Sequence, residues 1–360
     1  MAQRLAQMNG SEHNGSSGLT LTVLGCGMYN MTLFLSSRDQ QCTNLGTLGI
    51  GILSGILSSV SDLDTLAPPP FGPSESGTST PSDELPPRIP SSFIACVRRP
   101  ESAKRIKTAL SAYKSSITIL QNDNLKGAHE ADVVILGCKP QTVGDILGVD
   151  GMRDALKGKL LISILAGVPV SQIEDILYGA GTADRRPEEE DEGRCRIVRV
   201  MPNTASLVRE GMTVIATSTP PLPSTLNALV TWIFSRIGRV VHLPPSLMDA
   251  STALCGSGPA FMALVLEAIA DGAVAMGLPR AEAQLMAAQT MRGTAGLVLN
   301  GEHPALVREK VSTPGGCTIG GLLVLEEGRV RGTVARAVRE ATVVASQLGK
   351  GVQGVNGTRF

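Results

Sequence analysis

The 360-residue sequence has few aromatic residues and no excess of either charge sign. Phe, Trp and Tyr together make up 3% of the chain, so few rings are available to stack on nucleic-acid bases. The 32 Lys and Arg residues balance 32 Asp and Glu residues, so no net positive field draws the chain to nucleic acids or anionic membranes. We therefore expect neither a nucleic-acid partner nor a membrane partner.

The chain also lacks paired-cysteine spacing and an apolar signal segment. Its seven cysteines are scattered, and the four histidines do not cluster with them, which argues against a disulfide framework or a metal site. The polar first 18 residues have no signal core. The apolar stretch "FMALVLEAIADGAVAMG" carries Glu267 and Asp271, which favours a buried helix over a membrane span. We expect a cytoplasmic protein with reduced thiols.

Short β-branched runs alternate with helical stretches from Thr20 to about Val241. This alternation indicates βαβ units and a mostly parallel sheet, an α/β fold class. The predicted strands lie at 21–25, 93–97, 116–120, 132–138, 160–167, 196–202, 211–217 and 238–243, and the predicted helices at 101–113, 141–156, 169–178 and 222–236.

The composition changes after Pro245, where the pattern becomes all-helical with many small residues on the apolar faces. An ordinary helical domain is one interpretation; we favour a dimerisation domain, because a bundle with so few large side chains gains much from a partner. The predicted organisation is a disordered arm (1–18), a sheet domain (19–244) with insertions at 28–46, 67–92 and 179–194, a helical domain (245–349) and a tail (350–360).

A broken glycine motif follows the first predicted strand. In dinucleotide folds, a GxGxxG turn joins a strand to a helix and lets the backbone approach the pyrophosphate. Here "GCG" at 25–27 follows the strand, but Asn30 stands at the third-glycine position. Omitting residues 28–46 joins "GCG" to "TLG" at 47–49, where a helix-like run begins. We therefore predict a cofactor-binding turn made of Gly25, Cys26, Gly27, Thr47, Leu48 and Gly49.

The segment 28–46 has no clean helical or strand period and no helix cap. Residues 27–29 can be encoded by a run containing GTATGT and residues 43–44 by ACTAAC, which look like a fungal splice donor and branch site. We favour a translated retained intron, and a genuine surface insertion is the alternative. As written, the segment separates the phosphate turn from its helix, so we expect weak dinucleotide binding.

Arg98 and Arg99 end the second predicted strand, where NAD-binding proteins usually carry an acidic residue for the ribose. Two guanidinium groups suit a 2′-phosphate. The pair therefore favours NADPH, with NADH as an alternative cofactor. A solvated basic turn is the structural interpretation of the same residues.

Residues 311–325, "VSTPGGCTIGGLLVL", place a Pro-Gly-Gly turn before a helix. Such a turn exposes backbone N–H groups at a positive helix end, which suits a carboxylate. Thr313 and Thr318 put hydroxyls on either side of it. A plain turn with capping threonines is the alternative.

Taken together, the motifs at 254–280 and 303–326 look like the signature of pyrroline-5-carboxylate reductase. The stretches "VVILGCKPQ", "SILAGV" and "MPNTASLVREG" resemble that family's cofactor-side motifs, in the same order. The resemblance implies a Rossmann-type domain followed by a helical domain that intertwines with a second subunit, the homodimers often assembling into decamers. It implies NADPH- or NADH-dependent reduction of L-1-pyrroline-5-carboxylate to L-proline, the last step of proline biosynthesis.

The resemblance also implies roles for single residues. Thr318 would hydrogen-bond the ring nitrogen and assist its protonation. Thr313 and the backbone of Gly315 and Gly316 would hold the substrate carboxylate. The residues expected to line the cofactor are Asn124, Lys139, Pro140, Ala166 and Asn203. "SILAGV" departs from the family's commoner "CAAG" run, which could alter packing near the nicotinamide.

The sequence leaves two other functions open. Another imine reductase or a β-hydroxyacid reductase could use the same architecture, although the latter would be expected to need a lysine-type acid/base on a helix of the second domain. A non-catalytic dimeric protein would follow if the broken turn abolishes cofactor binding. The combination of Thr318 and Lys139 favours the enzyme, because nothing structural demands both.

Overall fold

The computed structural model describes residues 18–25, 47–61, 86–180 and 193–349. The tail, almost all of the predicted arm and most of the three insertions lie outside these ranges, and so do Cys26 and Gly27 of the phosphate turn. The side chain of Thr47 also lies outside the description.

Eight strands form one sheet in the order β3-β2-β1-β4-β5-β6-β7-β8. The first six strands in this order run parallel, in the Rossmann arrangement; β7 is antiparallel to β6, and β8 is parallel to β7. The mostly parallel α/β fold is confirmed. The strands are β1 (Leu19–Leu24), β2 (Pro90–Val97), β3 (Ile117–Gln121), β4 (Val133–Leu136), β5 (Leu160–Ser163), β6 (Arg196–Met201), β7 (Gly211–Ala216) and β8 (Gly238–Leu243).

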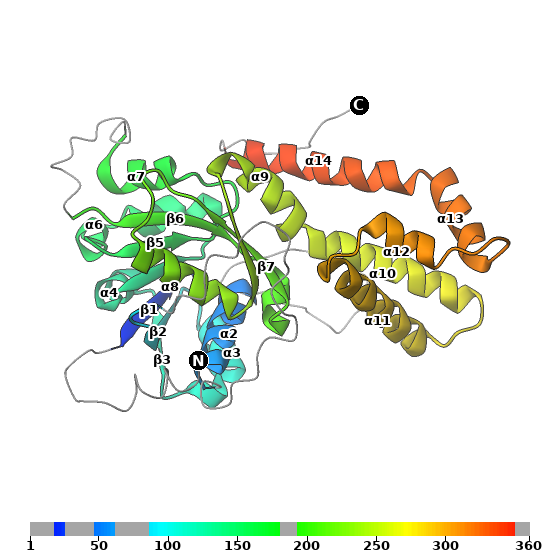
Figure 1. Cartoon of the computed structure of the whole chain (residues 1–360). Coiled ribbons are helices and arrows are strands. Elements are labelled where there is room, and N and C mark those ends of the chain that lie inside the picture. Colours follow the sequence, from blue (N-terminus) through cyan, green and yellow to red (C-terminus); the bar gives the residue numbers. More distant parts are fainter. Residues whose placement is uncertain (1–17, 26–46, 62–85, 181–192, 350–360) are drawn as a thin grey trace.

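Helices cover both faces of the sheet (Figure 1). Helices α2 (Thr47–Ser61), α3 (Pro100–Ala109) and α8 (Ser224–Ser235) contribute to one apolar cluster. Helices α4 (Asn124–Glu130), α5 (Val143–Leu147), α6 (Met152–Ala155) and α7 (Val170–Tyr178) contribute to the cluster on the opposite face. Alternate residues of one strand serve the two clusters, as Val134 and Ile135 do on β4. Burial on both faces explains why the strands read as continuous apolar runs.

The single helix predicted at 141–156 is wrong. The structure has a 3-10 turn at Pro140–Thr142, then α5 and α6 as two short helices. Helix α5 ends at Leu147, and Gly151 before α6 has φ +85°, a left-handed conformation that interrupts a right-handed helix. The apolar spacing is helical on both sides of this break, which is why the pattern suggested one helix.

The second half of the chain is helical, as predicted. It comprises α9 (Met248–Ser251), a π-helical turn (Thr252–Gly256), α10 (Gly258–Ala275), α11 (Arg280–Leu299), α12 (Pro304–Lys310), α13 (Cys317–Glu327) and α14 (Val330–Gly349). Figure 1 shows α10 to α13 extending away from the sheet, with α14 returning along them to α9.

These helices leave much apolar surface uncovered within one chain. On α10, Leu264 is 67% exposed, and Met276 directly after it is 86% exposed. None of the eleven residues of α13, all of which the structure describes, is buried. By length and composition alone, the helical stretch Pro245–Ala275 could also span a membrane. A face of this kind on a folded domain more often binds another protein surface.

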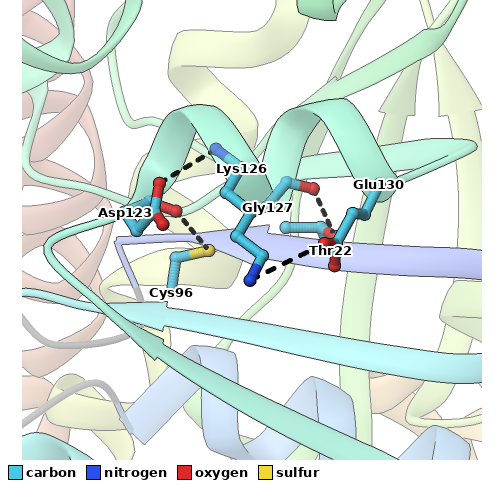
Figure 2. A network of polar contacts seen from close by, with 6 residues as sticks. All are labelled: Thr22, Cys96, Asp123, Lys126, Gly127 and Glu130. Atoms are coloured by element: carbon cyan, nitrogen blue, oxygen red, sulfur yellow. Dashed lines mark hydrogen bonds and ion pairs between the residues drawn. The ribbon is translucent and has the colours of Figure 1, made fainter.

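Helix α4 lies unusually close to the strands beneath it (Figure 2). The Thr22 hydroxyl donates a hydrogen bond to the carbonyl oxygen of Gly127 at 2.9 Å. Asp123 caps the helix by accepting the N–H of Lys126 at 3.1 Å, and its carbonyl oxygen lies 3.8 Å from Cys96 Sγ. A Cβ atom on Gly127 would stand 2.3 Å from that sulfur. The glycine therefore sets how near α4 approaches β1 and β2.

Replacing Gly127 with alanine should destabilise the protein by about 1–3 kcal/mol, because the added methyl overpacks the buried Cys96. Gly144→Ala in α5 is the matched control, since the methyl it would add has no described atom within 4 Å apart from the adjoining residues and backbone of its own helix. Alanine there should be neutral or slightly stabilising. Chemical denaturation measures both changes, and equal stability of the two variants would contradict the close-approach argument.

Candidate functional site

The predicted cofactor residues gather at one edge of the sheet. Because β1 to β6 are parallel, the segments that follow their carboxyl ends lie along the same edge. Strand order reverses between β1 and β4, and this switch point is where open α/β sheets form a ligand crevice. The residues that follow the six strands include Gly25, Arg98, Arg99, Asn124, Lys139, Pro140, Ala166 and Asn203.

At the switch point, Gly25 meets the loop that follows β4. Its φ of +79° favours glycine, and a Cβ atom there would lie 2.8 Å from the Cα of Cys138. The N–H of Gly137 donates to the carbonyl oxygen of Leu24 at 2.9 Å and holds the two loops together. The sequence motif identified Gly25 but gave no sign that Cys138 is the residue it packs against.

Helix α2 begins at Thr47, as predicted, and forms the crossover between β1 and β2. Gly49 is buried and Leu48 packs against the core. Further along the helix, a Cβ atom on Gly55 would come within 2.3 Å of Ile237. The helix expected to carry the end of the phosphate turn is thus seated closely on the sheet domain.

The basic pair and Asn124 occupy neighbouring turns at the β2 and β3 end of this edge. Arg98 and Arg99 are both exposed, and neither guanidinium makes a hydrogen bond or ion pair with the described part of the chain. Asn124 is half-buried as the first residue of α4, whose cap is supplied by Asp123 instead. The two guanidinium groups are therefore available to an anionic ligand.

Lys139, Pro140 and Ala166 lie at the β4 and β5 end. The carbonyl oxygen of Lys139 accepts both the N–H and the hydroxyl of Thr142, at 2.9 and 3.0 Å, so that Pro140 opens a tight turn. Lys139 and Pro140 are half-buried. Ala166 is also half-buried and packs against the cluster that contains Met248, where the helical half begins.

Asn203 has a structural task that the sequence did not reveal. Its side-chain oxygen accepts the backbone N–H of Met212 at 3.3 Å, and its carbonyl oxygen accepts the Ser206 hydroxyl at 2.6 Å. These bonds tie the loop after β6 to the start of β7. Asn203 is 9% exposed, so only a small part of this residue faces solvent at the sheet edge.

The thiols near this edge stay protonated at neutral pH. Burial is the main cause that raises the pKa of Cys96 to about 12 and that of Cys138 to about 11. A thiol with so high a pKa is neither a nucleophile nor a proton donor at pH 7. Within the described ranges, no group of three His, Cys, Asp or Glu side chains is placed to hold a metal ion.

The predicted substrate residues form one turn at the start of α13. Gly315 has φ +66°, and a Cβ atom on Gly316 would lie 2.5 Å from the Thr313 hydroxyl oxygen. Thr313 and Gly315 are exposed, while Thr318 is half-buried in the first turn of the helix. We call residues 313–318 the substrate loop. It combines two hydroxyls with the unpaired N–H groups of a helix start.

One detail of this loop differs from the expectation. The N–H of Gly316 donates to the carbonyl oxygen of Thr313 at 3.0 Å and is therefore engaged within the loop. The N–H of Cys317, which opens α13, belongs to the donors that a helix start leaves without an intrahelical partner. A carboxylate at this loop would thus meet the N–H of Cys317 more readily than that of Gly316.

Within one chain, the substrate loop and the sheet edge do not meet. Figure 1 shows α13 at the end of the helical half that is farthest from the sheet. The predicted residues therefore form two groups, one at the sheet edge and one at the loop. Within one chain these two groups lie far apart.

Two family models match the chain. "Pyrroline-5-carboxylate reductase dimerisation" matches residues 245–348, and "NADP oxidoreductase coenzyme F420-dependent" matches residues 80–167. Among solved structures, the pyrroline-5-carboxylate reductase of Coxiella burnetii is 25% identical with a TM-score of 0.66, covering 92% of this chain and 99% of its own. The pyrroline carboxylate reductase of Plasmodium falciparum, solved with NADP bound, has the same TM-score at 22% identity over 93% of this chain and 100% of its own, a likeness of fold.

Curated relatives are more similar in sequence. The pyrroline-5-carboxylate reductase of Lophium arboricola is 63% identical over 344 residues, which cover 96% of this chain and 98% of the relative. That of Neurospora crassa is 53% identical over 96% of this chain and 97% of its own length. The pyrroline-5-carboxylate reductase of Schizosaccharomyces pombe is 42% identical over 85% of this chain and 97% of its own length. The chain belongs to the pyrroline-5-carboxylate reductase family.

Proposed function

We propose that this chain reduces L-1-pyrroline-5-carboxylate to L-proline with NADPH, the last step of proline biosynthesis. The observation that carries the proposal is 63% identity to a pyrroline-5-carboxylate reductase over nearly the whole of both chains. The substrate loop supports it, because a small anionic imine needs both a carboxylate site and a hydroxyl beside the ring nitrogen.

The sheet edge fits the cofactor. Gly25 lets the turn after β1 pack closely on Cys138, and the exposed Arg98 and Arg99 suit a 2′-phosphate. The surface that we assign to the cofactor is completed by Lys139, Pro140, Ala166, Asn124 and Asn203. When bound, NADPH supplies the hydride for the imine carbon; NADH is the alternative donor.

The residues of the substrate loop align and polarise the imine. We assign the carboxylate to the Thr313 hydroxyl and to the backbone around Gly315 and Gly316, including the N–H of Cys317. Thr318 then places its hydroxyl beside the ring nitrogen and favours the protonated imine. A protonated imine is already electrophilic, so the reaction requires alignment more than a strong base.

A complete site needs two copies of the chain. The substrate loop of one copy lies far from its own sheet edge (Figure 1), and the helices that carry it expose apolar faces. The dimerisation model covers this same region. We propose that the loop of each protomer completes the site on its partner. Assembly of such dimers into decamers and a cytoplasmic location stay predictions, as do the domain boundaries at 244 and 349.

Thr318→Ala should lower kcat for pyrroline-5-carboxylate about a hundredfold, because it removes a hydrogen bond to the reacting nitrogen. NADPH affinity should change little. Steady-state kinetics and a fluorescence titration of NADPH separate the two effects. Thr318→Ser retains the hydroxyl and should keep most of the activity, and Thr108→Ala at an exposed position of α3, outside the helical half, is a surface control. An unchanged kcat in Thr318→Ala would refute the role assigned to this hydroxyl.

Deleting residues 28–46 should raise NADPH affinity at least about tenfold, because the deletion rejoins the phosphate turn to the start of α2. This segment lies outside the described residues, so the expectation rests on the sequence. Both purified forms are titrated with NADPH and assayed for turnover. Equal affinity would identify 28–46 as a tolerated surface insertion, and a major mRNA whose reads run uninterrupted through these codons would exclude a retained intron.

A further inference from the structure

A charged side chain is buried where the sheet meets the helical half. Arg199 on β6 is 8% exposed, and its Nη2 atom is buried without a hydrogen-bond partner. Burying a guanidinium without full pairing costs several kcal/mol. An arginine retained in such a position needs an explanation beyond packing.

The surroundings of Arg199 place it under the first helix of the second domain. It pairs in register with Ser163 at the end of β5, and Met201 lies two residues further along the same face of β6. Met201 packs in one cluster with Met248, which begins α9. The π-helical turn after α9 also contacts β6. Arg199 thus lies beneath the start of the helical half.

The next residue of α9 supplies the opposite charge. Burial lowers the pKa of Arg199, and the carboxylate of Asp249 acts in the opposite direction, favouring the charged form. No hydrogen bond or ion pair joins the two side chains in the described structure, so the attraction between them acts through space. At the exposed rim of the same junction, Arg292 of α11 lies 3.7 Å from Glu210.

We propose that Arg199 is a positioning residue for this reductase, an inference that rests on the proposed function. Its buried guanidinium, attracted by Asp249, fixes the direction in which α9 and the π-helical turn leave the sheet. That direction determines where α10 to α13 carry the substrate loop, and therefore how the loop meets the sheet edge of the partner subunit.

The effect of Arg199 on the direction of α9 is separate from its effect on the stability of the fold. An apolar residue of similar size at this position could leave the fold equally stable or more stable, because no charge would then be buried. It would, however, remove the buried charge that attracts Asp249 of α9 and would leave α9 seated on the apolar Met201 cluster alone at this point. Misplacement of reacting groups by about 1 Å lowers rates about a hundredfold.

The test uses the full-length dimer with Arg199→Met, Arg199→Lys, Asp249→Asn and the double variant Arg199→Met/Asp249→Asn. Arg196→Met, an exposed arginine on the same strand, is the matched control. We expect Arg199→Met to keep NADPH affinity within about twofold while kcat falls about 10- to 100-fold. Lysine should recover part of kcat. As a single variant, Asp249→Asn should lower kcat. In the double variant it should cause no further loss of kcat beyond that of Arg199→Met.

Hydrogen–deuterium exchange of residues 248–256 supplies a readout that does not depend on turnover. It should become roughly fivefold faster in Arg199→Met and stay unchanged in Arg196→Met. Unchanged exchange, wild-type kcat in Arg199→Met, or equal losses of NADPH affinity and kcat would each overturn the positioning role. Failure of the wild-type chain to reduce pyrroline-5-carboxylate would instead refute the proposed function, and the exchange result would still decide the role of Arg199.

Discussion

The distance between the substrate loop and the sheet edge of the same chain determines how this molecule can form a complete site. The loop at 313–318 sits at the start of α13, and Figure 1 shows that helix at the far end of the helical half. A hydride can pass only between groups in near contact. If the imine binds at the loop and the nicotinamide at the sheet edge, as proposed, one chain folded in this way cannot align the two by itself. The exposed apolar faces of α10 and α13 are then the expected surface of a protein that works as a dimer.

The sheet edge depends on close backbone approach. Gly25 fits against Cys138 with no room for a methyl group, and Gly127 fits against Cys96 in the same way on the crossover from β3 to β4. Both thiols are buried and stay protonated. Small residues at these contacts keep the strand ends close together. The thiols there carry no charge, so the positive charge that we assign to the 2′-phosphate comes from the exposed Arg98 and Arg99. The predicted insertion at 28–46 follows Gly25 closely in the sequence and lies outside the described residues.

The sequence predicted the sheet well because its central strands are buried on both faces and turn residues bound the strands. It predicted the turn before α13 because Pro-Gly-Gly before a helix has few structural alternatives. It failed where tertiary geometry decides: the break at Gly151, the internal hydrogen bond of Gly316 and the loop-holding role of Asn203. The role proposed for Arg199 could not be predicted for the same reason, because a position in a strand does not indicate which helix will cover it.

Subunit complementation tests the shared site most directly. A Thr318→Ala chain is co-expressed with an Arg98→Glu/Arg99→Glu chain, and the mixed dimers are assayed for NADPH-dependent reduction of pyrroline-5-carboxylate. Each parent alone should be nearly inactive. If each loop serves the partner's sheet edge, every mixed dimer regains one intact site, and an equal mixture should reach about a quarter of wild-type activity. Activity no higher than that of the parents would show that loop and edge work within one chain, and would contradict a site shared between two subunits.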